Sequence, residues 1–465
     1  MNLLPGWVAG LGYLVAAVCF IVAIKGLASP RTARRGNLIG ALGAALAVAV
    51  VLLSTDFLTT NLVIVLVTIV IGAALAVPVA RRVPITDMPQ LVALFNGIGG
   101  GAAALVGIVE LSQHEVLGIE GDAMAPVAMA TGIGIGSLTL VGSIVTFLKL
   151  QGWMTSRPVV LPGAPVLFGA SVLVTVAAAV AVAVTENIWW GVLTLVAAGA
   201  FGVLLVLPVG GADVPIVISL LNATTGLAVI ATGWAVDNVL LLVAGTLIGA
   251  AGTILTLAMA RGMGRSVAGI LFGALRGGST AGSTEASDRP VRTATADDVA
   301  VTLAYARRIV VVPGYGLAVA QAQHTIAELV DALRERGVDV VYGIHPVAGR
   351  MPGHMNVLLA EANVDYDLLV EAGDVNPTMP ATDVVIVVGA NDVVNPAART
   401  EPAAPIYGMP IIDADAAGQV FFLKRSMRPG FAGIENELLF SEKTQVLFGD
   451  AKDSLAAVLA GLTSA

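Results

Sequence analysis

The chain has 465 residues, of which 57% are hydrophobic and only 12% are charged, and its mean hydropathy is +0.90. Soluble globular domains carry roughly 25% charged residues, so this composition excludes a chain that is water-soluble throughout. The formal net charge of −8 argues against nucleic acid as a partner. A single cysteine, Cys19, excludes an intrachain disulfide, and the four scattered histidines show no metal-ligand spacing, so we expect no metal site.

The first half of the chain is predicted to cross a membrane nine times. A membrane-spanning helix needs about 20 apolar residues to cross roughly 30 Å of hydrocarbon. The segments that meet this requirement are 6–24, 38–54, 61–80, 88–111, 126–148, 160–184, 188–209, 214–234 and 239–260. The first segment has its positive charge after the apolar run, which is typical of a retained span rather than of a cleaved signal peptide. No histidine falls within any of these segments.

The charged residues between these spans predict the orientation of the chain. Basic residues occur only in alternate loops, at Lys25, Arg31, Arg34, Arg35, Arg81, Arg82, Lys149 and Arg157. The opposite loops lack Lys and Arg and contain Asp56, Glu115, Glu120, Asp122, Glu186 and Asp237. Positive residues mark the cytoplasmic side of a membrane. We therefore expect a multi-pass membrane protein with its N-terminus outside and its C-terminal domain in the cytoplasm.

The fourth, fifth, eighth and ninth spans contain glycines and polar residues, whereas most of the others are almost purely aliphatic. Small residues let helices approach closely, and buried amides need hydrogen-bond partners. We expect these four spans to form an inner bundle along a polar path that includes Asn96 and Asn222, with the second, third, sixth and seventh spans facing lipid. Asp213, in the turn before the eighth span, would lie at the cytosolic end of this path. Helix packing alone, and an ordinary carboxylate in a turn, are the alternatives for these residues.

The composition divides the chain into three parts. Residues 1–261 are expected to form the membrane domain. Residues 262–290 are rich in Gly, Ser and Thr, which is typical of a linker. Residues 291–465 alternate predicted strands and helices, and they predict a Rossmann-like α/β domain with a parallel sheet.

The first predicted strand of this domain leads into a glycine-rich turn. The strand covers 309–312, and the sequence GYGLAVAQAQ follows from Gly314 and opens a helix that runs to about Arg336. A strand, a Gly-x-Gly turn and a helix together are typical of a site that holds a pyrophosphate at a helix N-terminus. Val319 replaces the third glycine of the usual pattern, so the motif alone is a weak signal. The order of elements around it favours a dinucleotide site.

Two later strand ends indicate which dinucleotide is bound. The second strand, 338–342, ends without the carboxylate that NAD-binding folds use to hold the ribose 2′-hydroxyl. The strand at 420–423 is followed by Lys424, Arg425 and Ser426, and such donors suit a 2′-phosphate. The sequence therefore favours NADP(H) over NAD(H). A solvated basic strand end is the alternative.

Two further segments are predicted to be ligand loops. The segment 345–362 places Arg350 among glycines and prolines before an apolar helix. The buried strand 384–388 is followed by Gly389-Ala390-Asn391-Asp392, at the carboxyl end of a strand, where open α/β sheets bind ligands. An ordinary turn is the alternative for Asn391 and Asp392.

The motifs GYGLAVAQAQ, HPVAGRMPGHMN, GANDVVNPAA and KRSM, in this order behind nine spans, resemble the β subunit of proton-translocating NAD(P) transhydrogenase. The resemblance covers essentially the whole chain. It implies an inner-membrane enzyme in which hydride passes from NADH to NADP⁺ while protons move into the cytoplasm. NADP(H) would bind to this chain and NAD(H) to an α subunit with its own membrane helices, without metal or flavin. The αβ unit would form a dimer in the lipid bilayer.

The resemblance also implies roles for individual residues. The residues expected at the nucleotide are Gly314, Tyr315, Gly316, Ala318, Val319, Ala320, Arg350, Gly389, Asn391, Asp392, Lys424, Arg425 and Ser426. Those expected to link protonation to hydride transfer are Asp392, Asn222, Asp213 and Asn96. Some members of the family have His in place of Asn96 and Tyr in place of Phe431. Because no histidine falls within the expected spans, we expect the titrating group at mid-membrane to come from the partner.

The rival interpretation is an ion channel or transporter with a regulatory nucleotide-binding domain. Such a protein needs a selectivity filter or broken substrate-binding helices, and the sequence has neither signature. The cationic segment Lys424–Ser426 also has no role in it. The enzyme is therefore the preferred interpretation.

Overall fold

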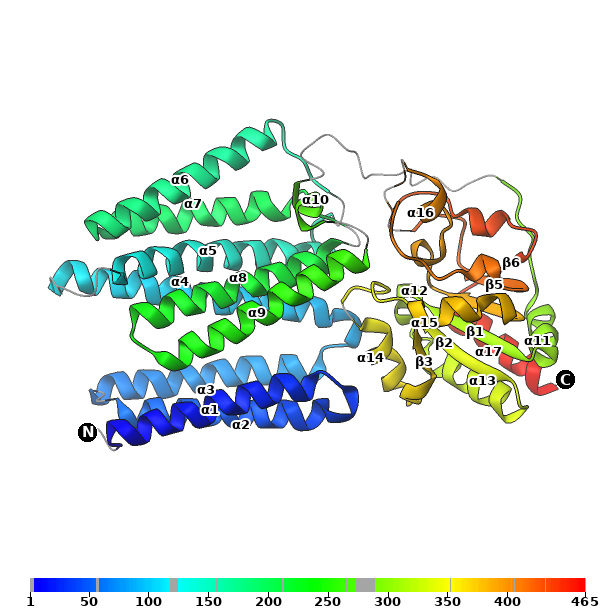
Figure 1. Cartoon of the computed structure of the whole chain (residues 1–465), viewed down its shortest axis with the longest axis horizontal. Helices are drawn as coiled ribbons and strands as arrows, with labels where there is room; N and C mark the ends of the chain where they lie inside the picture. Colours follow the sequence, from blue (N-terminus) through cyan, green and yellow to red (C-terminus); the bar gives the residue numbers. More distant parts are fainter. Residues whose placement is uncertain are drawn as a thin grey trace.

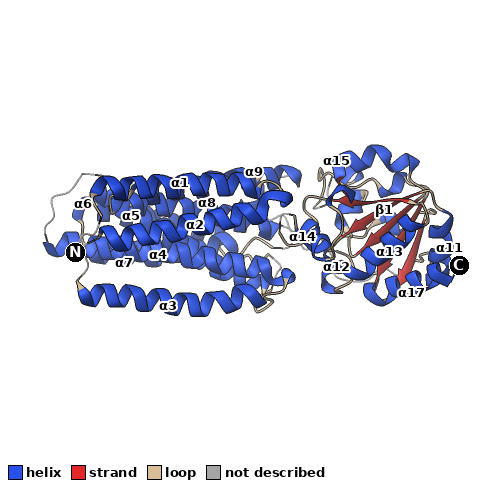
Figure 2. Cartoon of the chain, turned by 90° about the horizontal axis from the view of Figure 1, so that it is seen from below, coloured by secondary structure: helices blue, strands red, loops and turns tan. Residues whose placement is uncertain are grey.

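The computed structural model of the chain divides into a helical half and an α/β half (Figure 1). The residues that the structure describes are 4–55, 58–117, 124–155, 158–210, 213–263, 266–272, 289–351, 353–402, 404, 406–430 and 432–464. The N-terminus lies at the end of the helical half that is farthest from the α/β half, and the C-terminus lies at the opposite end of the molecule (Figures 1 and 2).

Within the described residues, nine helices of the helical half are long and apolar enough to span a membrane. They are α1 (Gly6–Leu27), α2 (Pro30–Ser54), α3 (Thr59–Arg82), α4 (Met88–Leu117), α5 (Ala125–Leu150), α6 (Ala164–Thr185), α7 (Ile188–Val206), α8 (Val214–Ala235) and α9 (Val239–Gly262). These helices confirm the nine predicted spans. Their ends differ by several residues, and α4 continues well past residue 111. As a result His114 lies within α4, and the expectation that no histidine falls in a span is wrong.

Glycines bring the central helices into backbone contact. A methyl group on Gly136 of α5 would lie 2.5 Å from the carbonyl oxygen of Gly100 on α4. A methyl group on Gly245 of α9 would lie 2.8 Å from the carbonyl oxygen of Gly226 on α8. Close approach of helices through small residues is a general way to pack helices in lipid, where no hydrophobic force draws them together. The pairs α4–α5 and α8–α9 are therefore among the close-packed pairs of the bundle.

The expected division into inner and lipid-facing helices holds only in part. α5 and α8 are the most buried, α3 has no buried residue, and α6 has few; α3 lies at the edge of the bundle in Figure 2. However, α7 is as buried as α4, while α9 is more exposed than either. The reason is that α7 also contains small residues: Gly199 packs against Val141 and Ser137 of α5, and Gly202 approaches the carbonyl of Leu138. The prediction that the seventh span faces lipid is therefore wrong.

The α/β half contains a six-stranded parallel sheet, which confirms the predicted fold class. Its strands are β1 (Arg308–Pro313), β2 (Asp339–Ile344), β3 (Leu369–Glu371), β4 (Val384–Val388), β5 (Gln419–Lys424) and β6 (Thr444–Phe448). Their order across the sheet is β3-β2-β1-β4-β5-β6. This is the order of dinucleotide-binding folds, in which the connections leave the sheet in opposite directions from β1 and β4 and open a crevice there.

Side chains alternate between the two faces of this sheet and form two cores. On one face, residues such as Ile309 and Val311 pack against α11 (Ala296–Tyr305), α13 (Gln323–Glu335), α14 (His354–Glu361) and α17 (Ala451–Ser464). On the other face, residues such as Val310 and Val312 pack against α15 (Ala372–Val375) and the segments around Met379, Ile412 and Leu438. Strands covered on both faces explain the continuous apolar runs in the sequence.

The helix expected from Gly314 to about Arg336 is broken: α12 (Tyr315–Val319) ends before α13 begins, and Gln321 between them has a φ of +52°. The three residues between them, Ala320, Gln321 and Ala322, cannot by themselves signal such a break, which depends on packing against the sheet. Most of the linker expected at 262–290 lies outside the described residues, and its described part includes the short helix α10 (Val267–Phe272). In the α/β half, a further short helix, α16 (Ala397–Thr400), follows β4.

Candidate functional site

The loops that follow β1 and β4 meet backbone to backbone at the crevice of the sheet. Gly314 N donates to Val388 O over 2.9 Å, and Gly316 N donates to Gly389 O over 2.9 Å. A methyl group on Gly316 would lie 2.6 Å from the Cα of Gly389, which itself has a φ of +69°. The glycines at these positions therefore allow the two loops to touch, and the predicted glycines all lie at one edge of the sheet.

The remaining residues of the first loop face different directions. Tyr315 and Ala320 are half-buried, while Val319 is 44% exposed. Ala318 is buried in the core beneath the sheet, so its side chain does not face the crevice. Because α12 is a single short turn, the predicted helix N-terminus is much shorter than the sequence pattern indicates.

The end of β5 lies beside the loop after β4. Lys424 Nζ donates to Asn391 Oδ1 over 3.1 Å, and Asp392 accepts from Asn391 Nδ2 over 3.0 Å and from Ala432 N over 2.9 Å. Burial lowers the pKa of the Lys424 ammonium to about 8, against an opposing effect of the Asp392 carboxylate. The chain passes directly over this group, since a methyl group on Gly430 would lie 2.7 Å from Asn391 Nδ2. Three predicted residues thus form one bonded cluster.

Lys424 is separated from the two residues expected to act with it. Its side chain turns toward Asn391, whereas Arg425 is exposed and Ser426 is half-buried. Ser426 Oγ instead accepts from Nε of Arg428 over 3.4 Å. Arg428 was not among the residues selected from the sequence. Its position two residues after Ser426, in KRSMR, could have indicated a further cation at this strand end. It adds a third cation to this end of the sheet.

The loop between β2 and α14 folds around two buried histidines. His345 Nδ1 accepts from Val347 N over 3.3 Å, and its Nε2 lies 2.6 Å from Pro410 O. His354 Nδ1 accepts from Arg350 N over 3.0 Å. Burial lowers the pKa of both rings, and for His354 burial and the Arg350 charge lower it to about 4. Both imidazoles are therefore neutral near pH 7, and the sequence did not single them out although they flank the predicted loop.

Arg350 connects this loop to the membrane helices. Its guanidinium lies over the ring of Tyr315, 4.3 Å from the centroid, and its Nη1 donates to Leu150 O of α5 over 3.4 Å. Burial raises the pKa of Tyr315, so this phenol stays protonated. In Figure 1, α12 and α14 lie on the side of the α/β half that faces the membrane helices, and α11 and α17 lie on the far side. The carboxyl edge of the sheet therefore faces the membrane half.

The membrane half contains a hydrogen-bonded polar cluster between α4, α5 and α8. Asn96 donates to Ser143 Oγ over 3.2 Å, and Thr225 donates to Asn96 Oδ1 over 2.8 Å. Nearby, the hydroxyls of Thr139 and Thr224 lie 2.9 Å apart. The structure thus places Asn96 in an internal polar contact, as expected.

Asn222 is not part of this contact, and no hydrogen bond among the described residues joins it to Asn96. At 3.6 residues per turn, Asn222 lies on α8 between Thr225, which faces α4, and Ser219, which donates to Gly252 O of α9 over 3.1 Å. Its side chain is half-buried. The described residues show no extended packing between α4 and α9. Asn222 therefore points toward the space between those helices.

Two titratable residues lie at opposite ends of the bundle. Asp213 immediately precedes α8 and is half-buried, at the end near the α/β half. His114, at the other end, is only 7% exposed, and its Nδ1 lies 3.4 Å from Glu186 Oε2. The sequence interpretation missed His114 because it ended the fourth span too early.

The chain matches known proteins over nearly its full length. A family model described as NAD(P) transhydrogenase beta subunit matches residues 9–461. The chain belongs to this family. Two sequences named NAD(P) transhydrogenase subunit beta, both from Rhodospirillum rubrum, are each 45% identical to it over 446 residues, which cover 95% of this chain and 96% of the relative.

Membership of the NAD(P) transhydrogenase beta subunit family confirms the resemblance found in the sequence. The chain is a component of an oxidoreductase that uses nicotinamide nucleotides, and it is a multi-pass membrane protein. A beta subunit also implies an alpha subunit as its partner. Across the part of the chain that the structure describes, no three His, Cys, Asp or Glu side chains are grouped as metal ligands.

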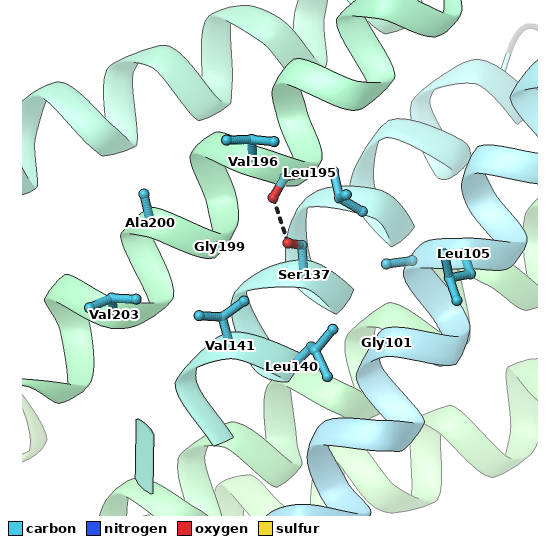
Figure 3. A pocket seen from close by; sticks show the side chains of 11 residues that line it. Gly101, Leu105, Ser137, Leu140, Val141, Leu195, Val196, Gly199, Ala200 and Val203 are labelled. Atoms are coloured by element: carbon cyan, nitrogen blue, oxygen red, sulfur yellow. Dashed lines mark hydrogen bonds between the residues drawn. The ribbon is translucent and has the colours of Figure 1, made fainter. Parts of the chain in front are cut away.

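A pocket in the membrane half of this family member lies away from the sheet edge (Figure 3). It has a volume of about 420 Å³, and it is lined by Gly101, Ala104, Leu105, Ser137, Leu140, Val141, Leu195, Val196, Gly199, Ala200 and Val203. Its one hydroxyl, on Ser137, already donates to Leu195 O over 2.5 Å. A lining of this kind suits an apolar chain and has no group that could hold a nucleotide phosphate.

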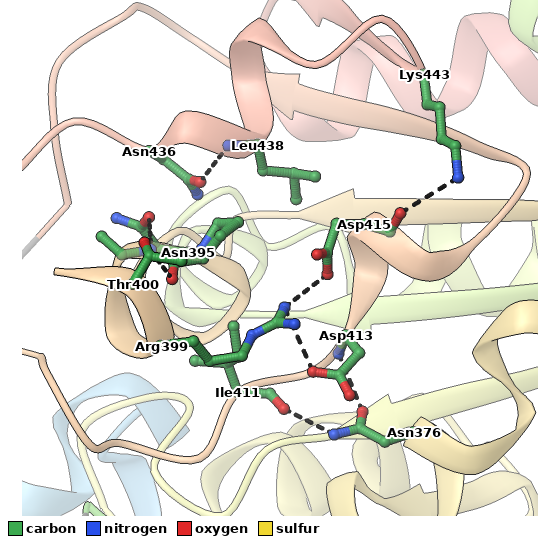
Figure 4. Close-up of polar contacts among 12 residues, drawn as sticks. Asn376, Asn395, Arg399, Thr400, Ile411, Asp413, Asp415, Asn436, Leu438 and Lys443 are labelled. Carbon is green, nitrogen blue, oxygen red and sulfur yellow. Dashed lines mark hydrogen bonds and ion pairs between the residues drawn. The ribbon is translucent and has the colours of Figure 1, made fainter.

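A second polar group braces the α/β half beside β4 (Figure 4). Arg399 Nη2 lies 2.7 Å from Asp415 Oδ1 and 3.4 Å from Asp413 Oδ1. Asn376 accepts from Asp413 N over 3.0 Å and donates to Ile411 O over 2.8 Å. Burial raises the pKa of Asp413, although Arg399 opposes the shift. These bonds hold the segment before β5 and do not reach the crevice.

Proposed function

We propose that this chain holds NADP(H) at the carboxyl edge of its sheet and couples hydride transfer from NADH on the α subunit to proton translocation into the cytoplasm. The observation that most supports this is the bond from Arg350 to Leu150 O. It joins a loop of the sheet edge to α5, the helix that also carries Ser143 of the polar cluster. A domain that binds the nucleotide and a helix that lines a proton path would need such a connection.

The residues at the sheet edge fit NADP(H). Lys424, Arg425, Ser426 and Arg428 can donate to a 2′-phosphate, and charge-assisted bonds to phosphate are the strong ones. β2 ends at Ile344 followed by buried His345, with no carboxylate that would repel that phosphate. The loops that begin at Gly314 and Gly389, including Val319 and Ala320, would line the dinucleotide. The bound nicotinamide supplies the hydride chemistry, so the role of the protein is to position the nucleotide and to control when the hydride is transferred.

Asp392 would connect this site to protonation. Its carboxylate is held by Asn391 and by Ala432 N, and it lies beside the buried Lys424 ammonium. Any change of charge on Asp392 would therefore change the pKa of Lys424. In the membrane half, Asn96, Asn222 and Asp213 would mark the proton path, with the N-terminus outside. The positively charged loops lie at the end of the bundle next to the α/β half, where Arg31 pairs with Asp367, which supports a cytoplasmic side there.

The same proposal assigns domains and location. Residues 1–261 would form the proton-translocating domain, 262–290 the linker and 291–465 the NADP(H)-binding domain, in the inner membrane. The α subunit would bring the NAD(H)-binding domain and further membrane helices, in a dimer of αβ units. Asn222 is half-buried and points between α4 and α9, which do not pack extensively against each other, so a helix of the α subunit packed there would bring the titrating group.

The test is hydride transfer in vesicles that contain this chain and its α subunit. We expect NADH to reduce NADP⁺ faster when a proton gradient directed toward the α/β side is imposed, since one proton falling through 100 mV releases about 2.3 kcal/mol. The double substitution K424A/R425A should weaken NADPH binding far more than NADH binding. Each charge-assisted bond contributes about 1.5–3 kcal/mol. Equal weakening of both nucleotides would contradict the 2′-phosphate assignment, and ion flux without hydride transfer would favour the channel.

A further inference from the structure

The end of α5 nearest the α/β half contains a buried ammonium group. Lys149 lies in the last turn of α5, and its side chain is only 2% exposed. Its Nζ donates to Val206 O over 3.2 Å, to Leu207 O over 2.5 Å and to Val209 O over 2.6 Å. An ammonium has three N–H donors, so these bonds use all of them. The side chain is therefore fixed at three points.

The three acceptors belong to one structural feature, the end of α7 and the turn that leads to α8. The last carbonyls of a helix have no partner within the helix and carry its partial negative charge. Val206 and Leu207 supply such carbonyls, and Val209 follows in the turn. A buried charge is costly unless it is fully hydrogen-bonded. Lys149 thus fastens α7 and the α7–α8 turn to α5.

The fastened turn sets the start of α8. Asp213 lies four residues after Val209 and immediately precedes α8. Val209 is buried in one apolar cluster with Ile216 and Val217 of α8, so this residue of the turn packs directly against the first turns of α8. Farther along α8, Thr224 and Thr225 make the hydrogen bonds to α5 and α4. The register of those bonds depends on where α8 begins.

The neighbouring residue of α5 contacts the α/β half. Leu150 O accepts from Arg350 Nη1, and Val347 of the same loop packs against the apolar cluster that contains Val209. Pro346 also approaches α9, where its Cγ lies 3.9 Å from the Cβ position of Gly262. Two consecutive residues of α5, Lys149 and Leu150, therefore contact the α7–α8 turn and the loop at the sheet edge.

We propose that Lys149 is a positioning residue for energy coupling: it locks the α7–α8 turn to α5, so that a displacement of the Arg350 loop on nucleotide binding is transmitted to Asp213 and α8. This inference rests on the proposed function, because it needs a nucleotide at the sheet edge and a proton path in the bundle. Lys149 touches neither the nucleotide nor the transferred proton in this account. Its role is mechanical, through the bonds that it donates.

The test compares three variants of the full αβ complex in vesicles. K149M keeps the aliphatic stem and removes the donors, K149R keeps charge and donors, and K25M is the matched control, because Lys25 is an exposed lysine at the same end of the bundle. For each variant we would measure the NADPH dissociation constant, the rate of hydride transfer, and the acceleration of that rate by an imposed proton gradient. A purely structural lysine would change all three together or none.

In K149M, we expect the acceleration of hydride transfer by the gradient to be at least tenfold smaller than in wild type. The NADPH dissociation constant of this variant should stay within about twofold of the wild-type value. K149R should retain at least half of the acceleration, and K25M all of it. Wild-type acceleration in K149M would overturn the proposal. Wild-type complex that shows no NADPH binding or no acceleration at all would instead contradict the proposed function, so the two failures are distinguishable.

A second measurement needs no variant and covers the case in which K149M does not assemble. Amide hydrogen exchange in the wild-type complex at Leu207, Val209 and Asp213 should change at least threefold between the NADP⁺-saturated and nucleotide-free states. Amides at the far end of α8, near Trp234, should change much less. Unchanged exchange throughout the α7–α8 turn would show that nucleotide binding is not felt there, and the proposal would be wrong.

Discussion

Thr225 donates a hydrogen bond to the side-chain oxygen of Asn96 over 2.8 Å and so joins α8 to α4 across the middle of the bundle. Asn96 in turn donates to Ser143 of α5. One amide therefore connects three helices. Because this contact lies between helices inside the bundle, loss of either partner leaves the other polar group without its hydrogen bond.

Replacing Thr225 by valine is expected to destabilise the complex by about 1–3 kcal/mol, since Asn96 loses its donor while the volume at the site is kept. The measurement is thermal unfolding of the purified complex in detergent. Thr246→Val is the matched control, because Thr246 is an exposed threonine on α9 that bonds only to Leu242 O of its own helix. Equal melting temperatures for the two variants would show that the bond to Asn96 contributes nothing.

Replacing Gly226 by alanine is expected to disrupt the α8–α9 pair. The added methyl group would lie 2.6 Å from the Cα of Gly249, and a backbone atom cannot rotate away. Overpacking of this kind costs about 1–3 kcal/mol. Gly72→Ala on α3 is the control, since nothing lies within 4 Å of that position. A Gly226→Ala complex as heat-stable as wild type would mean that α8 and α9 separate easily.

The lowered pKa of Lys424 predicts a pH dependence of NADPH binding. A phosphate favours the ammonium form, so affinity should be constant between pH 7 and pH 8 and fall by up to about tenfold per pH unit above that, until the higher pKa of Lys424 in the nucleotide complex is passed. Lys424→Arg should flatten this profile, because arginine stays charged. The measurement is the dissociation constant of NADPH from pH 7 to 10, with NADH as the control nucleotide. Parallel profiles for the two nucleotides would contradict a role of Lys424 at the 2′-phosphate.

The same pKa has a consequence for stability. The folded-state pKa of Lys424 lies below its unfolded value, so the unfolded chain binds more protons between pH 8 and about 10.4. The contribution of this residue to the free energy of unfolding should therefore increase as the pH rises through that window, and Lys424→Met should remove the increase. Thermal unfolding of the nucleotide-free complex at pH 8 and pH 10 would measure it.

The environment of Asn222 can be tested by cysteine labelling. In a Cys19→Ser background, Asn222→Cys should react with small aqueous reagents in this chain alone and become protected when the α subunit is bound, because the residue faces space between α4 and α9. Leu227→Cys, at a side chain on α8 that is 49% exposed, should react only with lipid-soluble reagents. Labelling of Asn222→Cys by lipid-soluble reagents alone would place Asn222 on the lipid face.

By itself, the sequence of this protein determined which segments become helices and strands. Apolar runs of about 20 residues have one stable form in hydrocarbon, because every backbone polar group must be bonded within the segment. The runs 309–312 and 384–388 likewise identify buried parallel strands, and Gly314 and Gly389 identify the turns after them. The distribution of Lys and Arg among the loops predicted an orientation, because positive residues mark the cytoplasmic side wherever they stand in a loop. These properties depend on neighbouring residues in the chain.

The tertiary structure alone decided which side chains meet. Lys424 turns to Asn391 rather than to Arg425, His354 is buried against Arg350 N, and Lys149 bonds to carbonyls 57 to 60 residues away. The burial of α7 and the break between α12 and α13 were likewise decided by tertiary contacts. Each depends on the register and approach of elements that are distant in sequence, and no local pattern encodes that distance. The glycines that permit such approach are visible in the sequence, but the helix or loop that each one meets is not.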